Sequence, residues 1–593
     1  MKNIFTKLMT GCMLLATAGA CNDEFLERYP LDQVTNETFW NSENDLRVYN
    51  NSLYNLVRND VDVPILMGHH DGFTSHYASI WFQDEFADNM APRAPRHTRF
   101  QQVRAGKHNV PSNPEWFGYR GWNFVRAINV GLDNYDRASI SQAVKDKYIA
   151  EARLFRGWFY AEKVSKFGDV PFVERELNID SEELFAARTP RKEAMAKVLA
   201  DLNFATEKLP ADWGDGNAPG RLNRWAALLV KARVCLFEGT FQKYHGGSDA
   251  NMWLEEAAKA SKSLIDNGPY RLYSTGDPQN DYNAFHRVLD VTGNPEVIAW
   301  RKYKLGVFTN HVQSYFSYSG GASKSMVEDY LCTDGLPITL SPLYKGDDKI
   351  EDVFVNRDPR LRQTVLHPDD TQKYKYDRAD GRTYPKLEGN EGGGMKTTTG
   401  YHIIKHYNAD DLIGKAYNTA ESPAIILRFA EALLVYAEAK AELGTITQSD
   451  LDLSINKLRD RVGMPHMELG KIAVDPRYTS DGVSPLIAEI RRERRVEMFM
   501  EGQRYSDLMR WKQGRKLVQP TMGMRWNDAA KARFGTTTMG TSVDPVSGKT
   551  YIDVYKGTDW AVPVFDETKH YLWPIPLNTL AQNPAIKQNP GWE

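Results

Sequence analysis

Residues 486–512 read LIAEIRRERRVEMFMEGQRYSDLMRWK and form the most strongly patterned run of this 593-residue chain. Good helix formers dominate residues 486–501, and Gly502 can take the left-handed conformation that ends a helix without a steric penalty. The run therefore predicts two helices, with the turn at Gly502 and the second helix over residues 503–512.

Charge is the unusual property of this run. Glu489, Glu493, Glu497 and Glu501 recur four apart on one face, and four arginines lie between them. Apolar residues occur on more than one side, so the helix is expected to pack on several neighbours. We therefore interpret the Arg–Glu pairs as half-buried ties between helices, in preference to a solvated face or a catalytic acid–base cluster. A structural role is predicted for Glu493, Arg494, Glu497, Gly502 and Arg504.

Further helices are predicted from apolar residues at helical spacing. Their ranges are 39–57, 122–132, 148–164, 190–209, 223–238, 252–265, 423–443 and 451–462. Helix pairs joined by short turns, each with an apolar face it does not bury alone, are typical of a stacked array such as tetratricopeptide repeats. Two segments interrupt the array, residues 269–421 and 514–593, which are rich in Gly, Pro, Tyr and Asp. We expect them to wrap the array, with short strands at 296–300 and 401–407.

The N-terminus has the pattern of a targeting segment. Lys2 and Lys7 precede a short apolar run, and small residues stand directly before Cys21. We interpret residues 1–20 as a lipoprotein signal peptide that is removed, after which Cys21 is acylated and anchors the protein to a membrane. An ordinary cleaved signal with an incidental cysteine is the alternative.

The remaining composition excludes several classes of function. The chain has 74 Lys and Arg against 77 Asp and Glu and no basic block, so nucleic acid is not an expected partner. Beyond the N-terminal segment only Cys235 and Cys332 remain, too few for a disulfide framework or a structural zinc site. Neither HExxH nor GxSxG occurs, so these motifs indicate no enzyme activity.

Several stretches together resemble one family. They are EARLFRGWFY followed by KFGDVP, then RDPRL, then ILRFAEALLVYAEA followed by INKLRDRVGMP, the run at 486–512, and the ending YLWPIPLNTLAQNPAIKQNPGW. With the signal before Cys21, their order resembles the SusD/RagB family of outer-membrane nutrient-binding lipoproteins over essentially the whole chain.

The resemblance implies a mostly α fold, with about four tetratricopeptide-like helix pairs as a curved scaffold against an irregular, loop-rich part. Residues 21–593 would form a single domain. Its scaffold would lie mainly in residues 36–60, 116–265 and 422–513, and its ligand-face and wrapping segments mainly in 61–115, 266–421 and 514–593.

The resemblance also implies a function. The protein would capture an oligosaccharide at the cell surface and deliver it to a SusC-like TonB-dependent outer-membrane transporter, without being an enzyme. A peptide- or protein-fragment-binding component like RagB is the alternative, and a surface glycosidase is a remote one.

Glycan binding requires flat apolar faces with polar groups nearby, which aromatic side chains supply. The resemblance implies that the ligand face draws on the loops before the first long helices and on the segment after the second helix pair. By this location alone, the candidate ligand-binding residues are Tyr77, Trp81, Asp84, Trp116, Tyr303, Tyr315, Phe316 and Tyr318, of which Trp81 and Tyr315 are the strongest. Core or loop-anchoring aromatics are the alternative reading. No cofactor is expected. His69, His70 and His76 carry side chains that could hold a metal, with polar loop contacts as the ordinary alternative. Calcium in the oxygen-rich loop 277–281 would match no defined pattern.

Overall fold

The computed structural model describes residues 39–59, 65, 67–69, 79–91, 99–113, 118–214, 220–313, 320–370, 384–388, 396–411, 413–414, 416 and 418–593. Helices dominate this part of the chain and the strands are short, so the mostly α prediction is confirmed. None of the described helices is both long and apolar enough to cross a lipid bilayer.

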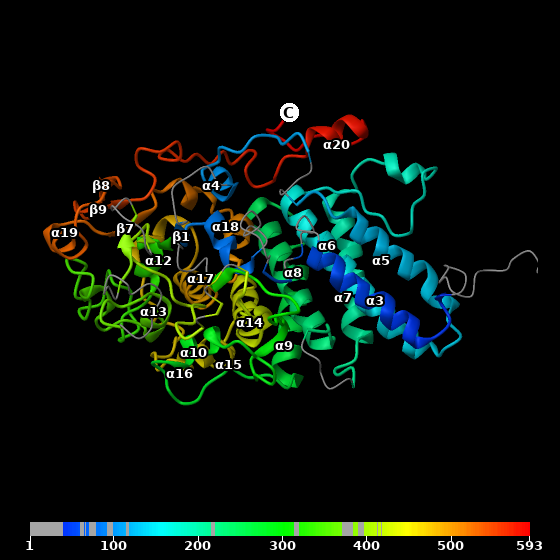
Figure 1. Ribbon diagram of the computed structural model, residues 1–593, viewed down its shortest axis with the longest axis horizontal. Helices are drawn as coiled ribbons and strands as arrows, with labels where there is room; N and C mark the ends of the chain where they lie inside the picture. The colour runs from blue at the N-terminus through cyan, green and yellow to red at the C-terminus, as the bar shows by residue number, and fades with distance from the viewer. Residues whose placement is uncertain are drawn as a thin grey trace, which may run out of the picture.

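The first half of the chain builds a stack of long helices, on the right and in the centre of Figure 1. Helix α6 packs on α5 and α7, and α8 packs on α7 and α9. Helix α8 starts where the Asn223 side chain accepts hydrogen bonds from two backbone amides, and it ends at Gly246, whose φ is 85°. The bounds are α3 Glu43–Asn59, α5 Trp122–Asn134, α6 Gln142–Phe167, α7 Arg191–Lys208, α8 Arg224–His245 and α9 Ala250–Asn267.

The stack continues into the second half of the chain through α14, which packs on both α9 and α17. Helix α18 returns to α8, so the last helix pair is tied to the centre of the stack. The bounds here are α14 Phe429–Glu442, α15 Gln448–Leu453, α16 Ile455–Arg461, α17 Pro485–Glu497 and α18 Arg504–Arg510.

The helix predicted over residues 423–443 is wrong at its start. Residues Ala424–Arg428 form strand β6, which pairs antiparallel with β2, Val297–Arg301. The sequence AIILR has apolar residues at helical spacing but is also rich in β-branched residues, and pairing with a distant strand decides between the two. The predicted strand at 296–300 is close to β2, whereas residues 401–407 make only isolated bridges, at His402 and Ile403.

Short elements fill the segments between and after the helices. The β7–β9–β8 sheet and α19 lie at the left end of the molecule in Figure 1, far from α3 and α5. The remaining helices are α4 Arg99–Arg104, α10 Asp281–Arg287, α12 Lys324–Asp329, α13 Pro359–Thr364, α19 Asp528–Phe534 and α20 Leu577–Gln582. The 3₁₀ helices are η3 Ile80–Phe86, η4 Tyr135–Arg137, η5 Glu182–Phe185, η6 Asp352–Phe354, η7 Pro476–Asp481 and η8 Gly514–Val518. The remaining strands are β1 Met90–Ala91, β3 Gly321–Ala322, β4 Lys386–Leu387, β5 Lys396–Thr397, β7 Met522–Arg525, β8 Thr541–Val543 and β9 Thr550–Asp553.

Helix α17 ends four residues earlier than the sequence predicts. It stops at Glu497, and the chain then turns through Met500 and Gly502, whose φ angles are 60° and 78°. A Cβ on Gly502 would lie 3.1 Å from the carbonyl oxygen of Ile80. Glycine therefore serves both the left-handed turn and the close approach to η3.

Candidate functional site

Glu497, at the end of α17, is the centre of a buried charge network. Its carboxylate lies 2.6 Å from Arg461 Nη2, 2.7 Å from Arg428 Nη1 and 3.0 Å from Arg360 Nη1. Burial alone would raise the pKa of Glu497, but these three guanidinium groups outweigh it and hold the pKa well below the ordinary value. One carboxylate thus joins α17 to α16, β6 and α13.

The other residues with a predicted structural role belong to similar pairs. Glu493 contacts Arg360 at 2.7 Å, Arg494 contacts Asp507 at 2.9 Å, and Arg504 contacts Asp88 at 2.7 Å. The side chains with predicted roles here are at most 6% exposed, so the network is buried rather than half-buried as the sequence suggested. Its position in the interior of the scaffold indicates an architectural part of the protein.

The structure brings three predicted ligand residues into one interior region. Trp81 and Asp84 lie on η3, and Tyr303 follows β2. Tyr303 Oη donates to His69 O at 2.8 Å and accepts from His69 N at 2.6 Å. The Trp81 indole stacks on the His406 ring, with centroids 4.1 Å apart and planes 5° from parallel.

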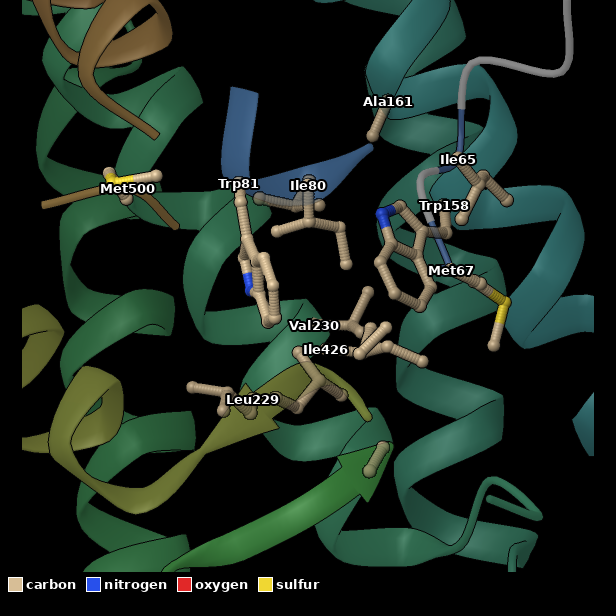
Figure 2. Packing of buried hydrophobic residues seen from close by; sticks show 14 of the residues in the cluster. Ile65, Met67, Ile80, Trp81, Trp158, Ala161, Leu229, Val230, Ile426 and Met500 are labelled. Atoms are coloured by element: carbon tan, nitrogen blue, oxygen red, sulfur yellow. The ribbon is translucent and has the colours of Figure 1, made fainter. Parts of the chain in front are cut away.

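Trp81 and Tyr303 are buried, so the prediction that they contact ligand is wrong. Trp81 is 3% exposed and Tyr303 is 1% exposed. Figure 2 shows Trp81 in the same buried cluster as Ile80, Leu229 and Ile426. Since their faces are covered by protein, these two rings offer no surface on which a sugar could stack, and they pack as core residues.

Asp84 also has an interior role. Its carboxylate accepts hydrogen bonds from Met500 N at 2.7 Å and Asn89 Nδ2 at 2.9 Å, which ties η3 to the turn after α17. Burial raises the pKa of Asp84 to about 6, although these two hydrogen bonds lower it. The prediction that Asp84 contacts ligand is therefore corrected as well.

The other candidates, Tyr77, Trp116, Tyr315, Phe316 and Tyr318, lie outside the described residues, as does Cys21. The nearest described residues in the chain to Tyr77 and Tyr315 are Ser79 and Gln313. Ser79 Oγ lies 2.9 Å from His69 Nδ1, and Gln313 Nε2 donates to His406 O at 2.8 Å. Both neighbours are thus anchored to the region that contains Trp81.

A cavity of about 160 Å³ lies on another side of η3, lined by Gln83 and Phe86 from that helix. The opposite walls come from α6, α7, α8, α18 and the C-terminal segment, which supply Trp158, Tyr505 and Trp573. Sequence reasoning missed this cavity because its walls are distant in the chain. The only available signal was the density of aromatic residues in the helices assigned to the scaffold.

Polar groups of both charges surround the aromatic walls of this cavity. Glu162 and Lys166 lie one turn apart on α6, and the Lys166 ammonium is 5.7 Å from the Trp573 ring centre. Burial lowers the pKa of Lys166, and Glu162 partly reverses this shift. Arg494 also lines the cavity, and its Nη1 is buried without a hydrogen-bond partner. Aromatic faces beside donors and acceptors form an environment suited to a polar ligand with an apolar side.

The described residues form no metal site. Among the described residues, no three His, Cys, Asp or Glu side chains are arranged to hold a metal ion. In the loop considered for calcium, Asp281 accepts hydrogen bonds from Ser274 Oγ at 2.8 Å and Thr275 Oγ1 at 2.6 Å. The carboxylate is therefore engaged by donors of its own loop. Of the three histidines considered, His70 and His76 lie outside the described residues.

Comparisons with family models give two matches. The model of the SusD family matches residues 279–592, which is more than half of the chain, and a model described as "Starch-binding associating with outer membrane" matches residues 24–236. Among curated relatives, SusD-like protein P2 of Formosa agariphila is 23% identical over 98% of this chain and 99% of its own length. A SusD-like protein of Bacteroides ovatus is 23% identical over 100% of this chain and 98% of its own length.

Solved structures share the fold. A SusD-like carbohydrate binding protein of Bacteroides fragilis has a TM-score of 0.72 and 23% identity, and the match covers 93% of this chain and 100% of that one. A laminarin binding SusD-like protein has a TM-score of 0.58 and 17% identity, with 93% and 100% of the two chains covered.

Proposed function

Because the chain belongs to the SusD family, we propose that it is a non-enzymatic glycan-binding lipoprotein of the outer membrane. It captures an oligosaccharide at the cell surface and delivers it to a SusC-like TonB-dependent transporter. The family match over residues 279–592 carries this proposal. Two structural neighbours, a SusD-like carbohydrate binding protein and a laminarin binding SusD-like protein, support the glycan class.

The proposed ligand contacts fall into two groups. The first is the cavity beside η3, where Tyr505 supplies a partly exposed ring, Gln83 supplies an amide, and the more deeply buried Phe86 and Trp573 complete the wall. The second is formed by the candidates outside the described residues, Tyr77, Trp116, Tyr315, Phe316 and Tyr318. Trp81, Asp84 and Tyr303 are removed from the proposed contacts because they are buried.

Calorimetry against a panel of oligosaccharides tests the function and the site separately. We expect the wild-type protein to bind at least one glycan, and we expect Tyr505→Ala or Tyr315→Ala to weaken that binding. Phe185→Ala is the control, because Phe185 is 63% exposed on η5 and does not line the cavity. If the wild type binds glycan and both variants bind equally well, the site is wrong and the function stands.

Two other outcomes would replace the function itself. Binding of peptide digests without binding of any glycan would identify a peptide-uptake component like RagB. Release of new reducing ends from a bound glycan would identify a glycosidase.

The lipid anchor is proposed from the sequence before Cys21. Replacing this residue, Cys21→Ala, should move the protein from the membrane fraction to the soluble fraction of cells. A variant that remains in the membrane fraction after a high-salt wash would contradict acylation at this position.

A further inference from the structure

A second cavity, of about 210 Å³, has a strongly charged lining. It lies among α4, α12, η7, α17 and the segment from η8 to β7. Three acidic side chains line it, Asp88, Glu328 and Asp329, against five basic ones, Arg104, Lys324, Arg477, Arg495 and Lys516. The lining therefore has an excess of positive charge.

Four of these basic residues have acidic partners. Lys324 lies 2.6 Å from Glu328 and Lys516 lies 2.9 Å from Asp481. Arg477 and Arg495 are paired in the same way, at 2.8 Å from Asp475 and 2.6 Å from Asp329. These side chains are held in place by the protein itself.

Arg104, the last residue of α4, is different. It is 2% exposed, and its guanidinium makes one hydrogen bond, from Nη2 to the backbone oxygen of Gln519 at 3.3 Å. Its Nε is buried without a partner, and it forms no ion pair with any residue that the structure describes. A buried guanidinium in this state is unfavourable, because a charge removed from water needs a counter-charge or hydrogen bonds in its place.

The buried acid of this region does not neutralise it. Glu85 of η3 and Arg104 both act on the phenol of Tyr555, whose ring centre is 5.1 Å from Arg104 Cζ. Neither carboxyl oxygen of Glu85 has a hydrogen-bond partner, and burial raises its pKa to about 8. Glu85 is therefore mostly protonated at pH 7 and supplies no anion to the Arg104 guanidinium.

A second orphaned group lines the same cavity. Thr521 is 4% exposed, and its Oγ1 is buried without a hydrogen-bond partner. A planar guanidinium and a hydroxyl are donors suited to an oxyanion, whose oxygens accept several hydrogen bonds at once.

We propose that this cavity binds an oxyanionic substituent, a sulfate or carboxylate group, of the captured glycan. Arg104 supplies the counter-charge and Thr521 a hydrogen bond. The anion site follows from the cavity itself, whereas its use for a glycan rests on the proposed function. The captured glycan is then an acidic one.

Calorimetric titration of the full chain with sodium sulfate, at ionic strength matched with sodium chloride, tests the anion site. The wild type should bind sulfate saturably. Arg104→Gln should weaken this binding by about tenfold or more, because a hydrogen bond to a charged group is lost. Thr521→Val keeps the shape of the side chain and should weaken it about threefold, which provides a test if Arg104→Gln does not fold.

The matched control is Arg533→Gln. Arg533 lines a different cavity and pairs with Glu351, so sulfate binding should not change. Absence of sulfate binding in the wild type, or equal binding by wild type, Arg104→Gln and Thr521→Val, would overturn the anion site.

Matched pairs of oligosaccharides, neutral and sulfated or uronic-acid-containing, test the glycan. We expect the acidic member to bind more tightly to the wild type, and we expect Arg104→Gln to remove that preference. If sulfate binds but acidic glycans show no advantage over neutral ones, the cavity takes free anions only and the glycan assignment is wrong. If sulfate binds and no glycan does, the proposed function fails while the anion site stands.

Discussion

The α17 network and the cavity at Arg104 both place charges in the protein interior, yet they satisfy them differently. In the network, Arg428 contacts Glu497 at 2.7 Å, Glu501 at 2.7 Å and Glu296 at 2.8 Å. In the cavity, Arg104 has no carboxylate partner among the described residues. A fully paired interior charge specifies how helices meet, whereas an orphaned one marks a place where a ligand can complete the structure.

Two buried glutamates show the same contrast through their pKa values. Burial raises the pKa of both Glu497 and Glu85, but only Glu497 has arginines that reverse the shift. Its pKa lies well below the ordinary value, while the pKa of Glu85 rises to about 8. The partners, and not the depth of burial, decide whether a buried carboxyl supports or weakens the fold at neutral pH.

The largest effect is expected from removing the centre of the network. Glu497→Ala leaves Arg360, Arg428 and Arg461 with less counter-charge in the interior, and should lower the free energy of unfolding by about 3–5 kcal/mol. Urea denaturation measures it. Glu468→Ala is the control, because Glu468 pairs with Lys471 at an exposed position, where such pairs contribute little. Glycan affinity per folded molecule should not change, and a stable variant that has lost glycan binding would contradict the architectural role.

The second effect concerns the acid without a partner. Between pH 4.5 and about 8 the unfolded chain releases the Glu85 proton while the folded chain retains it, so wild-type stability falls as pH rises. Glu85→Gln removes this dependence. At pH 9 the variant should be more stable than the wild type by about 2–4 kcal/mol, and at pH 4 the two should be similar. Urea denaturation across this pH range measures the difference, and parallel pH profiles would show that Glu85 is paired or hydrated in solution.

The contrast between the two regions also explains what the sequence could reveal. The helices of the scaffold follow from local apolar spacing and good helix formers, so residues 190–209 correspond closely to α7, Arg191–Lys208. The four-residue repeat of glutamates likewise indicated inter-helix pairing. It places Glu489, Glu493 and Glu497 on one face of α17, whereas Glu501 lies beyond the end of that helix.

Long-range contacts limit the remaining predictions. Whether Trp81 faces a sugar or a histidine depends on His406, which is distant in the chain, so its aromatic character alone did not determine its role. That Arg104 has no carboxylate partner within the described part of the chain is equally invisible in sequence, because it depends on where α4, η8 and β7 meet. The sequence thus indicates which residues form helices, but it does not indicate which charges remain unpaired.

A smaller effect is expected at the turn that leads from the network to the last helix. Gly502→Ala introduces a Cβ at a φ of 78° and 3.1 Å from Ile80 O, and should lower the free energy of unfolding by about 1–2 kcal/mol. Gly444→Ala separates the two causes, since Gly444 has a φ of 71° with no atom within 4 Å of the added Cβ. Equal losses in the two variants would assign the whole effect to backbone strain and none to the contact with η3.

The smallest effect on stability is expected at Arg104. The sign of the change distinguishes this unpaired arginine from the paired arginines of the network. In dilute chloride, Arg104→Gln removes a buried charge that is paired with no carboxylate of the described residues, so the free energy of unfolding should stay within about 1 kcal/mol of wild type or rise slightly. Arg461→Gln, in the network, removes a partner of Glu497 and should destabilise the protein by about 3 kcal/mol or more. Urea denaturation in chloride and in sulfate measures both.

Sulfate should stabilise the wild type relative to Arg104→Gln, since a ligand that binds only the folded state adds to its stability. A loss at Arg104 as large as that at Arg461, with no effect of sulfate, would show that both arginines belong to paired architecture.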